Sequence, residues 1–494
     1  MNYLDKTDRS DRIDGTDRLC RMSGSMKLCF SYKYILLLLF GVGVLGGVMV
    51  RGQVEGPRSP SMPTIAPRRT APAVLREAQA ESSFVDASEA YELAGGADDF
   101  LAARADLVSA ASDFLEVDLD RMTLTLYEAG EPVTTLTVLS KGRDGSWWET
   151  PTGEYRALSK VTNLYSSIGD VWMPWSVQFY GNFLIHGWPY YDDGTPVPEG
   201  YSGGCVRLSS EDAERVFRFA ERGMPIVVFD GESVTSVLPE LTPFREDIGV
   251  PSLTARAAYV TDLDTGEVVL DRGSTDVLPI ASLTKLMTTT VASEVMYLGR
   301  SVVIAADMLT DTVQSYPLTV GARYRLFDLL YPALMQSSNG AARALRSFFD
   351  EERFVREMNA KAVSLAMDDT TFSDLSGVDG GNVSTLRDMA KLSRYIMEKR
   401  GFLFSIARGE EYRVFEDNAF FGLRNYNEFV DDPRLVGVKN GESRAAGQTL
   451  LTVWRLRDAS GYERTLMMGV LGSADREADV ENILAWLEEG FGLQ

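Results

Sequence analysis

The chain has 494 residues, of which 45% are hydrophobic, and its 49 Lys and Arg against 71 Asp and Glu give a formal net charge of −22. This length allows about three domains, and the apolar fraction is enough to build real cores, which excludes a mainly disordered protein. The acidic charge makes nucleic acid a poor partner. Three cysteines and one histidine exclude most Cys/His zinc sites and a dense disulfide framework. We therefore expect no metal ion and no cofactor.

An uncharged apolar run spans Tyr34–Val50 and follows Lys27 and Lys33. Its length is at the short end for a transmembrane helix, and the two lysines favour an N-terminus inside the cell with the rest exported. We predict a single-pass anchor in the cell membrane, with a cleaved signal peptide and a buried core helix as alternatives. Residues 1–33 would then be a cytoplasmic tail, with Met26 as an alternative start, and the catalytic body would lie on the periplasmic, cell-wall side.

A Pro-, Arg- and Ser-rich stretch follows, and residues 51–97 are predicted to form an extended spacer. Apolar residues recur at helical spacing from Asp98 to Leu115, interrupted by Arg104, which predicts a packing helix. Alternation then predicts a β-hairpin over Val117–Val138, with its turn at Glu128–Pro132. The β-rich pattern continues to Phe229, broken by a helical run over Ser210–Arg222. Residues 98–230 are thus predicted to be a mainly-β domain with a leading helix.

The second body is separated by a Pro-containing stretch, residues 231–252, that reads as a linker. An acidic turn, Asp262–Gly266, lacks the ligand spacing of an EF-hand and is predicted to close a hairpin. Helical patterns dominate from Ser282 to about Arg400. Later segments complete a predicted α/β (α+β) domain over residues 253–494: strands around Leu435–Val438 and Thr449–Leu456, and a final helix over Ala478–Glu489.

One imidazole and one thiol stand close together in the β-rich domain. His186 precedes Gly187, and Cys205 follows Gly203 and Gly204. A cysteine attacks as the thiolate, an imidazole promotes that form and carries the proton, and glycines let backbone N–H groups point at a developing oxyanion. A buried structural cysteine with a core histidine is the alternative, and the scarcity of other Cys and His residues disfavours it.

These residues resemble the signature of the L,D-transpeptidases of bacterial cell walls, a His-Gly followed by Ser-x-Gly-Cys-x-Arg. The stretch Glu149–Tyr155 is similar to the family's Thr-Pro-Thr-Gly strand entry, and the resemblance covers roughly Phe114–Asp230. It implies a β-rich fold and a cysteine acyl-enzyme, formed by cutting a stem tetrapeptide at its L-centre–D-Ala bond and resolved by an amine or water. The implied site consists of the catalytic pair Cys205 and His186 with the substrate-binding residues Gly187, Ser202, Gly203, Gly204 and Arg207.

Two features of this first site stay open. Many family members carry His where this chain has Gly203, so a side-chain contribution is lost there. The segment Trp188–Tyr201 lies between the two halves of the motif. Either it contacts substrate or it is a plain connector.

A serine site without histidine is predicted in the second body. Ser282 and Lys285 are three residues apart, which places both on one face of a helix, where a desolvated lysine acts as base toward the serine hydroxyl. Ser337 and Asn339 supply a Ser-x-Asn after an apolar helix, and a Lys-x-Gly follows at residues 439–441. The order and spacing match the Ser-x-x-Lys, Ser-x-Asn and Lys-Thr-Gly set of penicillin-binding enzymes.

The body from about Ala255 to Gln494 resembles the D-alanyl-D-alanine carboxypeptidases, the low-molecular-weight penicillin-binding proteins; its length beyond Lys439 and the stretch Phe354–Asn359 favour these over a β-lactamase. The resemblance implies roles residue by residue: Ser282 as nucleophile, Lys285 as general base, Ser337 as proton relay, Asn339 and Lys439 as ligands of the substrate amide and carboxylate, with Asn440 and Gly441 beside them. Asn440 replaces the usual Thr and is expected to donate a hydrogen bond to substrate.

Both resemblances point to one polymer, so we interpret the chain as a peptidoglycan-remodelling enzyme of two successive steps. The Ser282 site trims pentapeptide stems, and the Cys205 site acts on the resulting tetrapeptides. Expected partners are stem peptides, β-lactams as covalent inhibitors, and the membrane through residues 34–50. The alternative is a wall-peptide-binding scaffold in which one or both sites are inactive, motivated by Gly203 and Asn440.

Overall fold

The computed structural model describes residues 97–230, 241, 249–310, 318–415, 418–420 and 422–494, and these belong to one compact unit that ends at Gln494. The predicted tail, membrane segment and spacer, and most of the linker, lie outside the described residues. Among the helices that the structure does describe, none combines the length and the apolar character needed to cross a bilayer.

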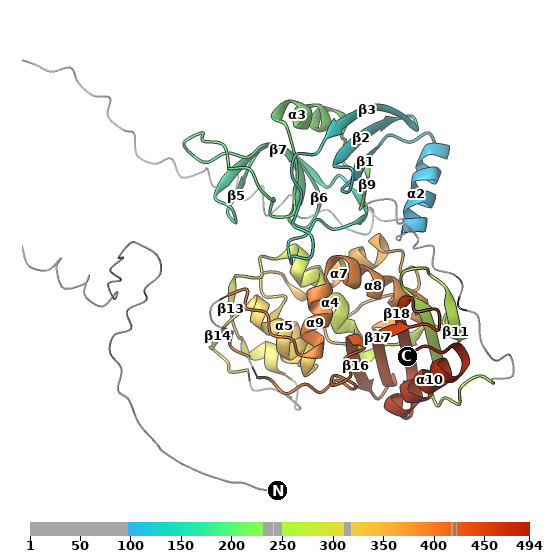
Figure 1. The fold of residues 1–494 in the computed structure, drawn as a ribbon. Coiled ribbons are helices and arrows are strands. Elements are labelled where there is room, and N and C mark those ends of the chain that lie inside the picture. The colour runs from blue at the N-terminus through green and yellow to red at the C-terminus, as the bar shows by residue number, and fades with distance from the viewer. Residues whose placement is uncertain (1–96, 231–240, 242–248, 311–317, 416–417, 421) are drawn as a thin grey trace, which may run out of the picture. The chain divides into compact units, whose positions relative to one another are not determined.

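The N-terminal domain is built from two sheets, which confirms the mainly-β prediction (Figure 1). The first has the order β3-β2-β1-β9-β4, and the second has the order β5-β6-β7-β8. Helix α3 packs against β6 and β7, and Ser209 caps it by accepting a hydrogen bond from the Asp212 N–H. The elements are α2 (Ala97–Ser109), β1 (Phe114–Asp118), β2 (Thr123–Glu128), β3 (Glu131–Thr137), β4 (Gly153–Arg156), β5 (Ser159–Ser166), β6 (Val171–Tyr180), β7 (Phe183–Gly187), β8 (Val206–Leu208), α3 (Ser210–Phe219) and β9 (Pro225–Phe229).

The leading helix is shorter than the sequence pattern predicts. It ends at Ser109, and Ala111 has a φ of 49°, a conformation that a helix does not contain. Phe114 and Leu115, predicted to lie on the helix, instead begin β1. Arg104, which interrupts the apolar face, forms an ion pair with Glu116 at 2.6 Å.

The predicted hairpin over Val117–Val138 is in fact three strands. β1 and β2 pair antiparallel, and the carboxylate of Asp118 accepts hydrogen bonds from the N–H groups of Asp120 and Arg121 at the turn between them. Such local bonds from an Asp side chain favour a turn over a continuous strand. The β2–β3 turn itself is confirmed, but it contains two residues, Ala129 and Gly130, both with positive φ.

The C-terminal domain has a five-stranded antiparallel sheet in the order β11-β10-β18-β17-β16, and helices α8 and α10 pack against β18 (Figure 1). The hairpin at the acidic turn is confirmed as β10–β11. The sequence pattern missed β18, although β18 is the central strand of this sheet. The strands are β10 (Ala257–Asp262), β11 (Val268–Arg272), β12 (Leu278–Pro279), β13 (Ser301–Val303), β14 (Arg323–Arg325), β15 (Val383–Ser384), β16 (Leu435–Ser443), β17 (Gly447–Arg457) and β18 (Glu463–Ser473).

A helical region lies between β11 and β16, as predicted, and includes the fully buried helix α4. A short 3₁₀ helix, η3 (Ala281–Leu283), leads directly into α4 and contacts β16 and β17. The helices are α4 (Thr284–Val295), η4 (Ala306–Leu309), α5 (Leu326–Met335), α6 (Asn339–Ala344), α7 (Glu351–Ser364), α8 (Leu386–Lys399), α9 (Gly401–Arg408) and α10 (Arg476–Phe491).

A buried ion network joins the two domains. The carboxylate of Glu294, in the last turn of α4, lies 3.2 Å from Lys361 Nζ and 3.0 Å from an Arg400 nitrogen, and all three side chains are fully buried. The Tyr395 hydroxyl donates to the same carboxylate. Lys361 also donates to the Tyr155 hydroxyl of the N-terminal domain at 3.5 Å. Burial lowers the pKa of Lys361 to about 8.

Polar contacts at two further points tie the same domains together. Arg400 donates to the backbone carbonyl of Glu149 at 3.1 Å. Lys399 forms ion pairs with Glu149 and with Asp230. Lys399 and Arg400 both lie at the end of α8, so the end of this one helix makes several contacts with the N-terminal domain.

Replacing Glu294 with Ala would remove the shared counter-charge of two buried cations. Leaving buried charges uncompensated costs about 3–5 kcal/mol, so Glu294→Ala should lower the free energy of unfolding by about that amount in urea denaturation at pH 7. The matched control is Glu211→Ala, which breaks an exposed ion pair with Arg215 and should change stability by less than about 0.5 kcal/mol. Equal effects of the two substitutions would contradict the importance of this network.

Candidate active sites

The thiol and the imidazole are placed by two neighbouring strands. β7 and β8 pair in parallel, with His186 opposite Arg207. Cys205 lies directly before β8, two residues from Arg207. His186, Cys205, Arg207 and Gly203 all line one cavity of about 420 Å³. The tertiary structure thus brings together the residues that the sequence singled out.

The turn before Cys205 is held by internal hydrogen bonds. The Ser202 hydroxyl accepts from the Gly204 N–H at 3.0 Å and donates to the Cys205 carbonyl at 2.6 Å. Thr150 donates to the Gly204 carbonyl at 2.8 Å. Ser202 is 3% exposed, so its hydroxyl supports the turn, rather than binding substrate as the resemblance implied.

The three glycines of this site differ in what they do. Gly204 has a φ of +107°, and a Cβ there would lie 2.3 Å from the Phe183 ring, so a larger residue would displace the turn. Gly203 has open space around it and lines the cavity. Gly187 is packed against Ser210, and its contribution is its carbonyl, which lies 2.7 Å from His186 Nδ1.

The contact of His186 with the Gly187 carbonyl fixes the tautomer of its imidazole. A carbonyl only accepts hydrogen bonds, so the contact with Gly187 places the proton on Nδ1 and leaves the Nε2 lone pair available. Burial lowers the pKa of His186 to about 4, against the opposing effect of the Gly187 carbonyl. The ring is therefore neutral at physiological pH.

The thiol of Cys205 is also neutral at rest, which differs from the expectation that the imidazole promotes the thiolate. Burial raises the pKa of Cys205 to about 11. It outweighs the backbone of Leu184 and the charge of Arg207, which both lower this pKa. Its Sγ donates to the carbonyl of Asn182 at 3.6 Å. Cys205 would therefore lose its proton to His186 during attack rather than beforehand.

The segment Trp188–Tyr201 is held in place by hydrogen bonds. Its residue Pro189 lines the cavity, whereas the Trp188 indole donates to the Val197 carbonyl within the segment at 2.8 Å. Tyr190 is held by a hydrogen bond from Asn163 of β5 at 2.7 Å. These contacts fix the segment to the β5–β6 hairpin.

The serine site is organised around Lys285, whose side chain is fully buried. Its Nζ donates to the Ser282 hydroxyl, the Asn339 side-chain oxygen and the Ser376 carbonyl, each at 2.8 Å. This arrangement joins the first two predicted motifs. Ser376 was not predicted as part of the site. It belongs to a turn in which the Asp374 carboxylate accepts hydrogen bonds from the N–H groups of Ser376 and Gly377.

Ser337, the predicted proton relay, lies two residues before Asn339. It occupies the turn between α5 and α6 with a φ of 55°. Within the described part of the chain its buried Oγ makes no hydrogen bond to protein. A buried hydroxyl without a partner costs free energy, and a bound substrate would supply the partner.

The third motif, residues 439–441, lies on strand β16, which brings Gly441 close to the backbone of Ser282. A Cβ on Gly441 would lie 2.8 Å from the Ser282 nitrogen, so this position requires the close backbone approach that glycine allows. Lys439 is fully buried, and its pKa is well below the usual value because of burial and then the charge of Lys285. An anionic substrate group bound next to Lys439 would favour its charged form.

Asn440 behaves differently from the expectation that it donates to substrate. Its side-chain nitrogen donates to the Tyr426 carbonyl at 2.8 Å and to the Glu428 carboxylate at 3.0 Å. Its side-chain oxygen accepts from Lys439 at 3.1 Å. An amide nitrogen carries two donors, and both are used within the protein.

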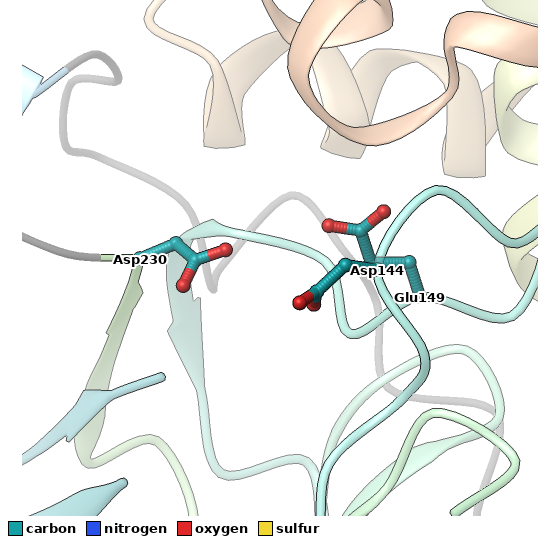
Figure 2. Close-up of side chains that lie close together, drawn as sticks. All are labelled: Asp144, Glu149 and Asp230. Carbon is teal, nitrogen blue, oxygen red and sulfur yellow. The ribbon is translucent and has the colours of Figure 1, made fainter. Parts of the chain in front are cut away.

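Three carboxylates, Asp144, Glu149 and Asp230, lie close together (Figure 2) with oxygens within 4.8 Å of one another. Lys399 forms ion pairs with Glu149 and Asp230, and Lys141 with Asp144 and Asp230. The two lysines compensate this charge, so the cluster acts as part of the contact between the domains.

Comparison with known proteins identifies both halves of the described structure. The family model of the L,D-transpeptidase catalytic domain matches residues 112–228, and that of D-alanyl-D-alanine carboxypeptidase matches residues 245–459. The D-alanyl-D-alanine endopeptidase of Pseudomonas aeruginosa is 30% identical over 248 residues, 48% of this chain and 78% of the relative. That of Escherichia coli K12 is 31% identical over 258 residues, 49% of this chain and 79% of the relative. A solved D-alanyl-D-alanine carboxypeptidase of Mycobacterium tuberculosis is 23% identical with a TM-score of 0.44, covering 50% of this chain and 95% of that one.

The raised pKa of Cys205, about 11, predicts how its thiol reacts without substrate. Because the thiolate fraction grows about tenfold per pH unit below the pKa, alkylation of Cys205 by iodoacetamide should be slow at pH 7 and still rising at pH 9. Peptide mapping by mass spectrometry separates Cys205 from Cys20 and Cys29. A rate that levels off below pH 8 would show instead a preformed thiolate–imidazolium pair.

Proposed function

The chain belongs to the D-alanyl-D-alanine carboxypeptidase family and carries an L,D-transpeptidase catalytic domain, and from this we propose that it remodels peptidoglycan in two successive steps. Ser282 removes the terminal D-Ala of a pentapeptide stem, and Cys205 then uses the tetrapeptide as acyl donor. The observation that carries the first step is the hydrogen bond from buried Lys285 to the Ser282 hydroxyl.

In the first step, Ser282 Oγ attacks the carbonyl between the two D-Ala residues while Lys285 takes its proton. Lys285 can take the proton only in its uncharged form, and its full burial beside the Ser282 hydroxyl supports this role. The Ser282 N–H then stabilises the oxyanion, and the close approach of Gly441 to this nitrogen supports the assignment. The leaving D-Ala amine takes up a proton, and water then hydrolyses the ester, regenerating the serine.

In the second step, His186 Nε2 accepts the Cys205 proton as sulfur attacks the carbonyl that precedes the remaining D-Ala. D-Ala leaves with that proton, and the thioester passes its acyl group to an amine or to water. The shared cavity of His186 and Cys205 supports this assignment. Arg207 adds positive charge on the same face.

The two sites lie at opposite ends of one helix. Ser282 lies in η3, which leads directly into α4, and at the far end of α4 the Val295 carbonyl accepts a hydrogen bond from Asn182 at 2.7 Å. The carbonyl of the same Asn182 contacts the Cys205 thiol. At 1.5 Å per residue α4 is about 18 Å long, so the tetrapeptide must leave one site to reach the other. Joining both sites in one chain raises its effective concentration.

The order of the steps is tested with a pentapeptide muropeptide as the sole substrate and mass spectrometry of the products. Cys205→Ala should accumulate tetrapeptide, because only the serine site remains. Ser282→Ala should leave the pentapeptide intact, because no tetrapeptide donor forms. Crosslinks made by Ser282→Ala from pentapeptide alone would refute the two-step scheme.

A wall-peptide-binding scaffold is the second candidate, and the occupied amide of Asn440 favours it for the serine site. Intact-protein mass after β-lactam exposure separates the candidates. Two live sites should give a penicillin adduct on Ser282 and a carbapenem adduct on Cys205, each abolished by substitution with Ala. A scaffold would give neither adduct.

The membrane segment proposed at residues 34–50 would place both sites on the periplasmic side.

A further inference from the structure

A short segment before β16 connects the second motif of the serine site with the third. The Tyr426 N–H donates to the backbone carbonyl of Met335, the last residue of α5, at 2.9 Å. The Asn427 side-chain oxygen accepts from the backbone N–H of Asn440 in β16 at 3.2 Å. The segment is therefore fixed at both sides, and its next residue, Glu428, contacts the third motif.

The Glu428 carboxylate lies between two polar partners. One oxygen accepts from the Asn440 side-chain nitrogen at 3.0 Å, and the other accepts from Nε of Arg476, the first residue of α10, at 2.8 Å. Only 13% of the Glu428 side chain and 17% of the Arg476 side chain are exposed. Arg476 also donates to the Gly441 carbonyl at 2.9 Å. A paired carboxylate is thus held in one place beside the third motif.

These contacts fix the orientation of the Asn440 amide. Its nitrogen faces two groups that only accept hydrogen bonds, the Tyr426 carbonyl and the Glu428 carboxylate. The side-chain oxygen is therefore turned toward Lys439, whose Nζ donates to it at 3.1 Å and to the Asn440 backbone carbonyl at 2.7 Å. A threonine hydroxyl has a single donor and would not fill both acceptors. The asparagine at position 440 and the carboxylate of Glu428 thus complement each other.

The same arrangement prepares Lys439 for an anionic ligand. An ammonium carries three N–H groups, and within the described part of the chain two of them are used by Asn440. Burial and then the charge of Lys285 lower the pKa of Lys439. The charge of Glu428 opposes this lowering, and its effect is larger than that of Arg476, which adds to the lowering. Glu428 therefore favours the ammonium form of Lys439.

We propose that Glu428 is a positioning residue of the serine site, which orients the Asn440 amide so that Asn440 holds the Lys439 ammonium for the terminal carboxylate of the stem peptide. Asn440 then acts on Lys439 rather than on the substrate. The inference rests on the proposed carboxypeptidase step and adds the residues that determine its preference for a free C-terminal carboxylate. It also accounts for the occupied Asn440 amide in an active enzyme.

Binding tests this preference without requiring turnover. The protein is the full chain carrying Ser282→Ala and Cys205→Ala. The probes are two N-acetylated peptides that end in D-Ala-D-Ala, one with a free C-terminal carboxylate and one with a C-terminal amide. An NMR titration should show the free acid binding about tenfold more tightly, as expected for one charge-assisted hydrogen bond. Equal affinities of the two peptides overturn the proposal.

Variants of Glu428 assign the preference to this residue. Glu428→Ala removes both the acceptor and the charge and should reduce the preference to about twofold or less. Glu428→Gln keeps an acceptor for Asn440 and should give an intermediate preference. The matched control, Glu442→Gln, changes an exposed carboxylate that lies 3.9 Å from Arg476 and should keep the full preference. Equal circular dichroism and thermal midpoints show that the variants are folded. An unchanged preference in Glu428→Ala overturns the positioning role.

A double-mutant cycle tests whether Glu428 acts through Asn440. Asn440→Ala should lose the preference by itself, and adding Glu428→Ala should then change the affinity for the free acid by less than about twofold. Effects of the two substitutions that multiply would show that Glu428 acts independently of Asn440, against the proposal. Because Glu428→Ala leaves Arg476 without its partner, the cycle is run with Glu428→Gln where the alanine variant does not fold.

Turnover separates this inference from the proposed function. The Cys205→Ala chain is incubated with each peptide, and release of D-Ala or its amide is followed by mass spectrometry. A KM for the free acid that rises about tenfold in Glu428→Ala, with kcat unchanged, supports both. A binding preference that depends on Glu428 without any release supports the positioning role and rejects the carboxypeptidase step. Release with an unchanged KM in Glu428→Ala rejects the positioning role and leaves the carboxypeptidase step standing.

Discussion

The buried carboxylate of Glu294 is the contact on which the relation between the two domains depends. It lies at the end of α4, between Lys361 of α7 and Arg400 after α8. Buried charges persist only when they are paired and hydrogen-bonded, so three helices are held to one arrangement. The same arrangement brings α7 to the Cys205 cavity and the end of α4 to Asn182.

Close backbone approach is the second constraint, and it shapes both catalytic turns. Gly204 packs on the Phe183 ring, Gly441 on the Ser282 nitrogen, and Gly377 so near the Ala281 carbonyl that a Cβ would lie 1.8 Å from it. Each contact excludes any larger residue. The motif glycines are therefore required because a Cβ has no room at their positions. Gly203, which has open space around it, is the exception.

The two sites handle charge in opposite ways. The cysteine site is buried and neutral, because desolvation raises the pKa of Cys205 and lowers that of His186. The serine site buries two basic side chains, the proposed base Lys285 and the proposed carboxylate ligand Lys439. An anionic stem terminus is thus matched to the second site. In the cysteine site, charge must develop during the reaction, and Arg207 and the backbone can then stabilise it.

The sequence by itself determined the order of the two domains, and it singled out Cys205 with His186 and Ser282 with Lys285, because these depend on residue types and spacings that chemistry restricts. Only the tertiary structure decided the end of α2 at Ser109, the central place of β18, the bonds that occupy Asn440, and the role of Ser376. Each of these rests on contacts between residues far apart in the chain. Local periodicity carries no record of such contacts, since a buried strand and a buried helix segment show similar apolar runs.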